Sequence, residues 1–499
     1  MSRLAELQGQ SFDVIVAGGG IVGCGVARDA ARRGLTVALF EQHDFGSGTT
    51  AASSRIIHGG LRYLETADFG LVRMDMRERE TLLRIAPHLV QPLEFTIPFG
   101  TAGAWQRVRL GIGLTLYDAL AWDSSLPRRR LRRADATYYD ARIDSPERLT
   151  LENVMDAAAH GARAFNYAEV TAPLTAGGAL AGVRVRDRLS GDEADVRARV
   201  VVNAAGPWLD RLAGRLTAPT GRVRTTKGVH LVCGPLTDRP LVLFSGVDGR
   251  LMFAIPRGGL TWLGTTDTDY DGDPADAVAT RDDVEYVLRS LQRAFPGLRV
   301  ADVLFTTAGV RALVRRPGHP SAVSRAHRID DRTMPGLVAI VGGKITGYRA
   351  IAEDATDAVC RVLGIDRRSN TADEPLPGAR EFRPGTSAPH LEAIYGSRAA
   401  EVLALAASDS ALARPLAAAY PDIGAQVVHA VRHEHCRTIA DFLRRRSLLG
   451  MTADQGWGAV EAVAGLMGAA LGWTAEQRAH ETDVYRRDIA RTESFRARS

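Results

Sequence analysis

The hydrophobic pattern at the start of the chain predicts a strand, a turn, a helix and a second strand in succession. The apolar run 12–17 is typical of a buried parallel strand. Apolar and small residues then continue at helical spacing over 21–33, and Gly34 ends the predicted helix. A second apolar run, 35–40, predicts the next strand, and the acidic residue Glu41 follows it directly. This order of elements is that of a βαβ unit.

Three glycines stand in the turn between the first strand and the helix. Gly18, Gly20 and Gly23 have the spacing G-x-G-x-x-G, which lets the backbone approach a pyrophosphate. The N-terminal N–H groups of the helix would point at the same phosphates. Glu41 comes eighteen residues after Gly23, close to where such folds place the acid that accepts hydrogen bonds from an adenosine ribose. The pattern predicts a dinucleotide site and leaves FAD and NAD open.

Later parts of the chain favour a flavoprotein over a compact NAD domain. The apolar run 199–203 ends in small residues and follows a long insertion. We interpret it as a second return of the chain to the nucleotide sheet, which is the organisation of a two-domain flavoprotein. The strand-like runs 227–232 and 253–270 suit an antiparallel sheet that covers a pocket.

The patterns together predict an α/β protein with three domains. The other predicted elements are helices 69–89, 149–161 and 282–295, and strands 164–170, 182–187, 304–311 and 336–341. We expect a discontinuous, Rossmann-like FAD-binding domain over 11–85, 145–222 and 300–365. An antiparallel-sheet substrate or cap domain takes 86–144 and 223–299, and an all-α C-terminal domain takes 380–499.

Composition and charge narrow the class of partner. The 499 residues are 45% hydrophobic and 24% charged, as in an ordinary globular chain long enough for two or three domains. The net charge of +5 favours contact with anions such as a phosphorylated substrate or an acidic lipid surface. Nucleic acid is not expected as a partner, because no long basic tract or aromatic-basic repeat occurs.

Cysteine spacing and hydropathy predict the cellular compartment of the protein and its contact with membranes. The four cysteines are far apart and form no C-x-x-C, so neither a zinc site nor a disulfide framework is expected and no metal is predicted. This usage fits a reducing cytoplasm. The chain shows no signal-peptide pattern and no run of about 18 apolar residues, so we expect any membrane contact to be peripheral.

The stretch 105–122 is the strongest candidate for such a contact. It is apolar, with basic and aromatic residues at its flanks. A buried helix of the substrate domain would have the same pattern, so both interpretations stay open. The arginine-rich segment 128–133 would either meet acidic lipid head groups or form a solvated loop.

Several segments resemble one family in the same order along the chain. The first signature is GGGIVGCGVARDAARRG over 18–34, and the second is GGKITGYRAIA over 342–352. The other similar segments are 57–64, 204–208, 227–230, 264–267, 309–311 and, in the C-terminal part, 441–446. Over essentially its whole length the chain resembles FAD-dependent glycerol-3-phosphate dehydrogenase.

The resemblance implies a specific reaction and location. It implies oxidation of sn-glycerol 3-phosphate to dihydroxyacetone phosphate, with FAD as the hydride acceptor and a membrane quinone as the next acceptor. It also implies a cytoplasmic protein attached peripherally to the inner face of the cell membrane; a homodimer stays open. Arg257 and the pair Arg315-Arg316 depart from the family pattern and affect what we expect of the pocket lining.

The predicted chemistry needs a base for the hydroxyl proton and cations for the phosphate. Histidine is the natural base at neutral pH, and we nominate His58 first and His230 second, the latter also for substrate binding. Arg311 and Arg325 are the first candidates for the phosphate, because guanidinium groups bind phosphate oxygens bidentately. Further candidates are Arg55 and Arg349 for the phosphate, and Lys344 for the flavin N1/O2 edge or the substrate oxygen.

The remaining predicted site residues concern the cofactor. Gly18, Gly20, Gly23 and Glu41 are assigned to the adenosine and pyrophosphate of FAD. Thr49, Thr50 and Ser54 are expected to line the isoalloxazine or the pyrophosphate. The residues expected to close the cofactor site are Gly206, Gly343, Lys344 and Thr346.

Three other functions are compatible with parts of this pattern. An oxidase would use the same pocket and return the flavin electrons to oxygen. A related flavoenzyme acting on an amino or hydroxy acid would leave the arginine surplus unexplained. A non-catalytic flavin-binding protein would show a disrupted His58 or Arg311 region, and neither region is disrupted.

Overall fold

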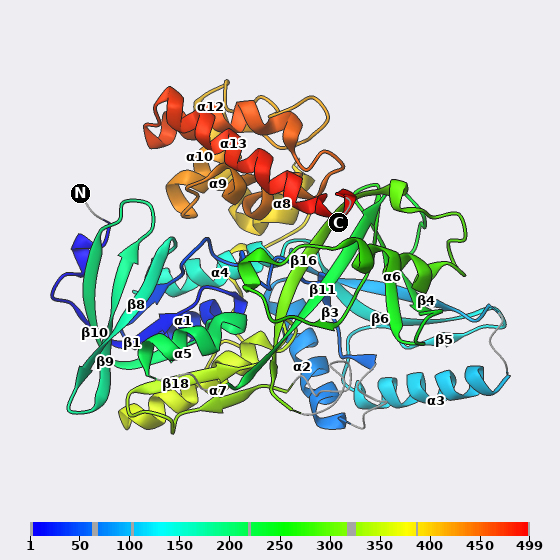
Figure 1. The fold of residues 1–499 in the computed structure, drawn as a ribbon, viewed down its shortest axis with the longest axis horizontal. Coiled ribbons are helices and arrows are strands. Elements are labelled where there is room, and N and C mark those ends of the chain that lie inside the picture. Colours follow the sequence, from blue (N-terminus) through cyan, green and yellow to red (C-terminus); the bar gives the residue numbers. More distant parts are fainter. Residues whose placement is uncertain are drawn as a thin grey trace.

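The computed structural model describes residues 3–61, 68–100, 104–217, 221–316, 326–385 and 388–497, in which two large sheets lie side by side beneath a group of helices (Figure 1). At the centre of the first sheet, β1 (Ser11–Ala17) lies parallel between β2 (Val37–Phe40) and β10 (Glu193–Asn203). The order along the main path of this eight-stranded sheet is β17-β18-β10-β1-β2-β7, and an antiparallel hairpin joins it through β10. The outer strands are β7 (Arg163–Phe165), β17 (Arg328–Asp330) and β18 (Leu337–Val341).

Both faces of the first sheet are covered, which explains its apolar strands. Val14 and Val16 of β1 pack with α1 (Ile21–Arg32), α4 (Pro146–Ala159) and α7 (Tyr348–Leu363). Ile15 points to the other face, where it packs with the antiparallel hairpin. The elements on that face are β8 (Ala168–Ala176), β9 (Ala179–Asp187) and α5 (Leu209–Leu216). The predicted second return of the chain is β10, whose pairing with β1 confirms it.

The second sheet is mainly antiparallel and runs β15-β11-β14-β13-β12-β4-β6-β3, with β16 paired to β11 and β5 to β6. Its long strands are β4 (Val90–Pro98), β6 (Asp135–Ile143), β11 (Val223–Cys233), β13 (Leu251–Arg257) and β16 (Val303–Val314). Its short strands are β3 (Ile56–Ile57), β5 (Arg130–Leu131), β12 (Leu241–Phe244), β14 (Leu260–Gly264) and β15 (Thr268–Asp269). β3 and β16 belong to this sheet by pairing, although the expected boundaries placed them with the first.

The helices beside the second sheet begin where the sequence supplies capping groups. α2 (Phe69–Ile85) begins after Asp68, whose side chain accepts a hydrogen bond from Leu71 N–H. α6 (Arg281–Leu291) begins with a capping box between Thr280 and Asp283. α3 (Ala104–Leu120) projects at the edge of the molecule. Helices were predicted at 69–89 and 282–295, whereas for 105–122 a buried helix was one of two open interpretations.

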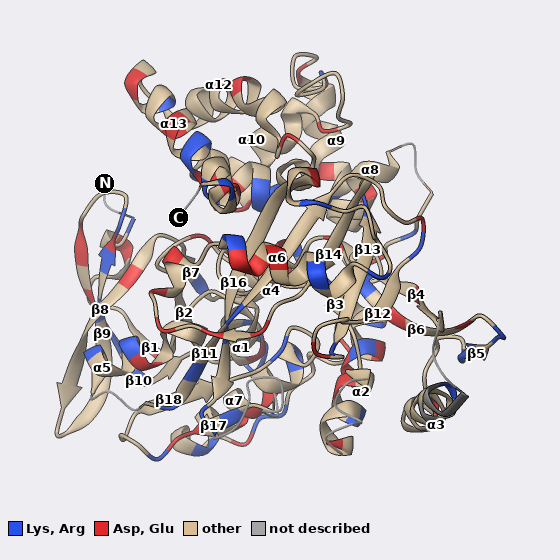
Figure 2. Cartoon of the chain, turned by 45° about the vertical axis from the view of Figure 1, so that its right-hand side comes forward, with Lys and Arg blue, Asp and Glu red and all other residues tan. Residues whose placement is uncertain are grey.

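The C-terminal part is helical, as predicted, and lies over the junction of the two sheets (Figure 1). Its helices are α8 (Pro389–Tyr395), α9 (Ala399–Ser408), α10 (Gly424–His433), α11 (Ile439–Asp441), α12 (Val460–Leu471) and α13 (Ala475–Thr492). A π-helical turn, Phe442–Arg446, follows α11 and carries three consecutive arginines. Figure 2 shows that positions of Lys and Arg and positions of Asp and Glu are interspersed along the described chain. Among the described residues, no helix combines the length and apolar character of a membrane span.

Candidate cofactor and substrate site

A cavity of about 1240 Å³ lies between the two sheets and the C-terminal helices. This volume exceeds the usual range of about 300–1,000 Å³ for small-molecule sites, so the cavity has room for a dinucleotide and a small substrate. Most predicted site residues lie in its wall: Gly18, Gly20, Glu41, Thr49, Thr50, Ser54, Arg55, His58, Gly206, Arg311, Gly343, Lys344 and Thr346. Gly23, His230 and Arg349 are not in this wall, and Arg325 lies outside the described residues.

The glycine turn allows α1 to begin directly against the ends of the strands. A Cβ atom on Gly23 would lie 1.9 Å from the Gly18 carbonyl oxygen, and one on Gly18 would lie 2.6 Å from the Ala204 carbonyl oxygen. Gly18 also has φ +116°, which favours glycine. A Cβ on Gly20 would meet nothing closer than 3.7 Å, so the fold itself leaves room there. A close approach of phosphate to the backbone therefore fits this turn.

Glu41 is oriented by the backbone around it. Its carboxylate accepts hydrogen bonds from Gly19 N–H at 2.6 Å and from His43 N–H at 2.8 Å. Burial raises the pKa of Glu41, and the two N–H donors oppose that rise. Each carboxylate oxygen keeps a second acceptor site for ribose hydroxyl groups. The residue thus fits the predicted adenosine-binding role.

Thr49 and Thr50 connect the segment after Glu41 to β16 and to the start of α1 through hydrogen bonds. Thr50 Oγ1 accepts a hydrogen bond from Ile21 N–H at 3.1 Å, which satisfies one of the free donors at the start of α1. Thr49 Oγ1 donates to the Val310 carbonyl of β16 at 2.5 Å. Both hydroxyl groups therefore support the cavity wall as well as lining it.

The loop before α7 contacts the segment around His58 in the cavity wall. Gly342 and Gly343 have φ angles of +79° and +126°. Thr346 Oγ1 accepts a hydrogen bond from His58 N–H at 3.2 Å, and Gly59 N–H donates to the buried Asp140 carboxylate, also at 3.2 Å. These backbone contacts hold His58 half-buried in the cavity wall.

Lys344 forms an ion pair with Asp75 of α2. Asp75 is fully buried, and burial raises its pKa to about 6, while the Lys344 ammonium opposes that rise and the carboxylates of Glu78 and Asp140 add to it. Lys344 itself lies in the cavity wall. The pair therefore joins a buried carboxylate to the surface that a ligand would contact.

His230 has a different environment from His58. It lies on β11, is 5% exposed, and its Nε2 is 2.8 Å from Ser54 Oγ, while its Nδ1 is 3.4 Å from Thr307 Oγ1. Burial and the positive charges of nearby arginines lower its pKa to about 3. His230 is therefore neutral at working pH and holds Ser54, which lines the cavity.

Arg311 presents its guanidinium across β11. Its Nη1 donates to the Asp267 carboxylate and its Nη2 to Thr265 Oγ1, both at 3.1 Å. The group passes over Gly228, where a Cβ would lie 2.1 Å from Nη2. This crossing explains why the chain has a glycine in the 227–230 segment.

Arg250 is a cavity residue that the sequence reasoning missed. Its Nη2 donates to the Thr265 carbonyl at 2.9 Å, so it meets the same residue as Arg311. Its Nε is buried without a hydrogen-bond partner among the described residues. The signal in the sequence was an arginine three residues before the predicted strand-like run that starts at residue 253.

Arg349 and Arg55 are directed elsewhere than predicted. The Arg349 guanidinium bonds to the buried Glu78 carboxylate at 2.6 Å, and Arg349 lies outside the cavity. Arg55 reaches the cavity wall, but its two Nη atoms donate to Glu147 at 2.9 and 2.6 Å. Both arginines thus have buried carboxylate partners, and Arg55 still reaches the cavity whereas Arg349 does not.

The comparisons with known proteins agree with this geometry. Residues 13–357 match a family model described as FAD dependent oxidoreductase, and 369–478 match the C-terminal domain of alpha-glycerophosphate oxidase. A glycerol-3-phosphate dehydrogenase of Synechocystis sp. is 37% identical over 96% of both chains. The chain belongs to the FAD-dependent glycerol-3-phosphate dehydrogenase family. FAD is the cofactor of the family, and the glycine turn and Glu41 fit its dinucleotide part.

Solved structures show the same fold. The glycerol-3-phosphate dehydrogenase of Bacillus halodurans, complexed with FAD, has a TM-score of 0.78 and 29% identity over 99% of this chain and 98% of its own. The L-alpha-glycerophosphate oxidase of Mycoplasma pneumoniae has a TM-score of 0.54 and 18% identity over 74% of this chain and 99% of its own. At 18% identity, the similarity to the second structure shows a shared fold only.

Two substitutions in α2 can be compared directly. Asp75→Asn removes the carboxylate that pairs with Lys344, and Glu78→Gln removes the one that pairs with Arg349. We expect both to lower the free energy of unfolding at pH 7.5, by about 3–5 kcal/mol as for other broken buried pairs. Only Asp75→Asn should also change how the flavin absorption spectrum responds to pH, because only Lys344 lines the cavity.

The pH titration has a defined direction. As the pH falls through about 6, the wild-type Asp75 carboxyl takes up its proton and Lys344 loses its counter-ion. We therefore expect a spectral change near pH 6 in the wild type and in Glu78→Gln, measured on the substrate-free holoenzyme. A change of the same size in Asp75→Asn would contradict the assignment.

Proposed function

We propose that this protein oxidises sn-glycerol 3-phosphate to dihydroxyacetone phosphate with FAD and passes the electrons to a membrane quinone. The observation that carries the proposal is a single cavity with a dinucleotide turn in its wall and His58, Arg311 and Lys344 in the same wall. Relatives named glycerol-3-phosphate dehydrogenase support the choice of substrate. Bound FAD supplies the acceptor for the hydride that leaves C2 of the substrate.

His58 is the base in this proposal. It lies in the cavity wall with its backbone anchored, so its imidazole is placed to take the proton of the C2 hydroxyl group. His230 is a poorer base, because a pKa of about 3 makes its ring hold a proton weakly. His230 instead orients Ser54 through the 2.8 Å contact. From the sequence, the two histidines were nominated in the same order.

Arg311 and Arg250 form the proposed phosphate site. Both line the cavity and both contact Thr265, so their guanidinium groups are held at one place on the second sheet. Charge-assisted hydrogen bonds of this kind contribute about 1.5–3 kcal/mol each. Arg325 remains a sequence-based candidate. Lys344, beside the start of α7, would stabilise negative charge at the flavin end of the site.

The proposed membrane contact rests on α3. Val108, Ile112 and Leu116 are spaced four residues apart and are 50%, 63% and 37% exposed, whereas Leu114 and Tyr117 of the same helix are buried. Trp122, 69% exposed, follows the helix. Exposed arginines of 128–133 lie near α3, because Leu131 of this segment lies beside Gly111 of the helix. An apolar stripe beside basic side chains suits the surface of an acidic membrane, here the inner face of the cell membrane.

The first test is anaerobic addition of sn-glycerol 3-phosphate to the yellow holoenzyme. We expect the visible flavin band to bleach and to recover quickly with a quinone analogue, because the proposal makes quinone the acceptor. Recovery that is fast with oxygen alone would make the enzyme an oxidase. Absence of bleaching would exclude this substrate and leave an amino or hydroxy acid as the alternative.

The base assignment is tested with His58→Gln and His230→Gln. General-base catalysis is typically worth about 10²–10⁴-fold, so His58→Gln should slow flavin reduction by about that factor while FAD stays bound. His230→Gln should have a smaller effect, because an amide still bonds to Ser54. Stopped-flow reduction rates at saturating substrate give both values. A near-normal rate in His58→Gln would move the role to His230.

Membrane binding is tested with Leu116→Asp in α3 and the control Leu403→Asp in α9, because both leucines are 37% exposed. Loss of one buried leucine from a bilayer contact should weaken binding to vesicles of acidic phospholipid by about tenfold or more. Cosedimentation measures the affinity. Equal binding by Leu116→Asp and the wild type, or an equal loss in Leu403→Asp, would exclude α3 as the contact.

A further inference from the structure

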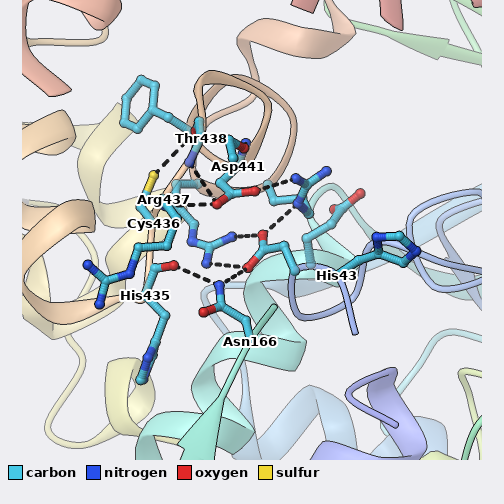
Figure 3. Close-up of polar contacts among 12 residues, drawn as sticks. His43, Asn166, His435, Cys436, Arg437, Thr438 and Asp441 are labelled. Atoms are coloured by element: carbon cyan, nitrogen blue, oxygen red, sulfur yellow. Dashed lines mark hydrogen bonds and ion pairs between the residues drawn. The ribbon is translucent and has the colours of Figure 1, made fainter. Parts of the chain in front are cut away.

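Asp44 links the cofactor loop to the C-terminal domain. The residue follows Glu41 by three positions, lies in the cavity wall and is 1% exposed. Its carboxylate accepts hydrogen bonds from Arg445 Nε at 2.6 Å and Arg446 Nη2 at 2.9 Å, and Arg446 Nη1 adds a further contact. Asn166 Nδ2 donates to the same carboxylate at 2.9 Å (Figure 3). Two arginines of the π-helical turn thus meet one buried acid beside the adenosine end of the site.

The arginines are themselves held in place from both sides. Arg445 Nη2 donates to Asp441 at 2.6 Å, and Asp441 also accepts from the hydroxyl group of Tyr167 in the first domain at 2.6 Å. Arg446 Nη2 donates to the Glu434 carbonyl at 2.6 Å. The two guanidinium groups hold the pKa of Asp44 well below its usual range, so the carboxylate stays charged.

The loop that Asp44 belongs to forms part of the wall of the dinucleotide site. Its backbone bonds to the first domain, with Tyr167 N–H donating to the His43 carbonyl at 2.7 Å and Gly46 N–H to the Gly19 carbonyl at 2.9 Å. Phe45 packs below the glycine turn, where a Cβ on Gly19 would lie 2.7 Å from its ring. Moving this loop would therefore move Glu41 and the turn that faces the phosphates.

We propose that the C-terminal domain completes the FAD site by holding the 41–50 loop through Asp44, Arg445 and Arg446, so that FAD affinity depends on this particular contact between the domains. The family models treat 13–357 and 369–478 as separate units, yet Thr438, Arg444 and Arg445 of the second unit line the same cavity as Glu41. By linkage, bound FAD in turn stabilises the docked domain. The inference depends on the cofactor of the family and is independent of the substrate.

A second buried pair across the same interface supplies the control. Arg148 of α4 and Glu434 of the C-terminal domain are 2.5 Å apart and at most 1% exposed, and neither lines the cavity. Glu434→Gln therefore removes an interdomain ion pair as Asp44→Asn does, without touching the cofactor loop. Arg445→Gln is a milder variant, because its side chain is partly exposed and Arg446 keeps its contacts with Asp44.

The experiment measures FAD binding to the full chain by titration of FAD fluorescence, with the thermal midpoint recorded for each variant. We expect the FAD dissociation constant to rise about tenfold or more in Asp44→Asn and less in Arg445→Gln, and to change by less than about twofold in Glu434→Gln. If Asp44→Asn fails to fold, Arg445→Gln carries the test. Wild-type affinity in Asp44→Asn and Arg445→Gln would overturn the proposal.

An equal loss of FAD in Glu434→Gln would also overturn the proposal, because the effect would then reflect general domain docking. Hydrogen exchange gives an independent readout. In the wild type, FAD should slow amide exchange over 434–447, whereas in Arg445→Gln this protection should shrink.

Discussion

The close approach of α1 to the strand ends is the constraint on which the rest of the structure depends. Gly23 lies so near the Gly18 carbonyl that no side chain fits between them. The first helix can therefore start at the edge of the sheet, with its N–H groups at the cavity. β10 brings the chain back beside β1, and its end at Ala204 closes the same turn. The dinucleotide part of the site is thus built where strands from distant parts of the chain end together.

Buried ion pairs decide how much of each cation's charge is available to a ligand in the cavity. The chain carries a surplus of basic residues, but Arg55 and Arg349 are neutralised by Glu147 and by Glu78. Arg311 forms an ion pair with Asp267 and Arg250 bonds to the Thr265 carbonyl, and both guanidinium groups lie in the cavity wall. Charge count alone therefore overstates the number of phosphate ligands, because a paired buried cation has little remaining attraction for a substrate.

The three parts of the chain contribute to one site, and each contributes a different property. The first sheet positions the glycine turn and Glu41, which suit a dinucleotide. The second sheet supplies Arg311 and His230 on the paired strands β16 and β11, and Arg250 immediately before β13. The C-terminal helices hold the loop after Glu41 through Asp44. Together they enclose a volume from which bulk water can be displaced, as hydride transfer and charge stabilisation require.

The sequence by itself determined the local elements and the cofactor class. Glycine spacing, apolar runs and Glu41 are local signals, so β1, α1 and β2 were predicted within a few residues. β4 and β6 were not predicted, because they mix polar and apolar residues and are recognised mainly by pairing with each other. For the same reason the sequence did not indicate that β3 and β16 join the second sheet, whose other strands lie far away along the chain.

Only the tertiary structure decided the roles of the charged side chains. From sequence, Arg311 ranked before Arg55 and Arg349 as a phosphate candidate, but no local pattern indicated that carboxylates of α2 and α4 would meet the other two. The same holds for Asp44, which is one acid in a polar loop until Arg445 and Arg446 reach it from about 400 residues later. The burial and pairing of a charge depend on which distant segments pack around it, and that information lies in the fold.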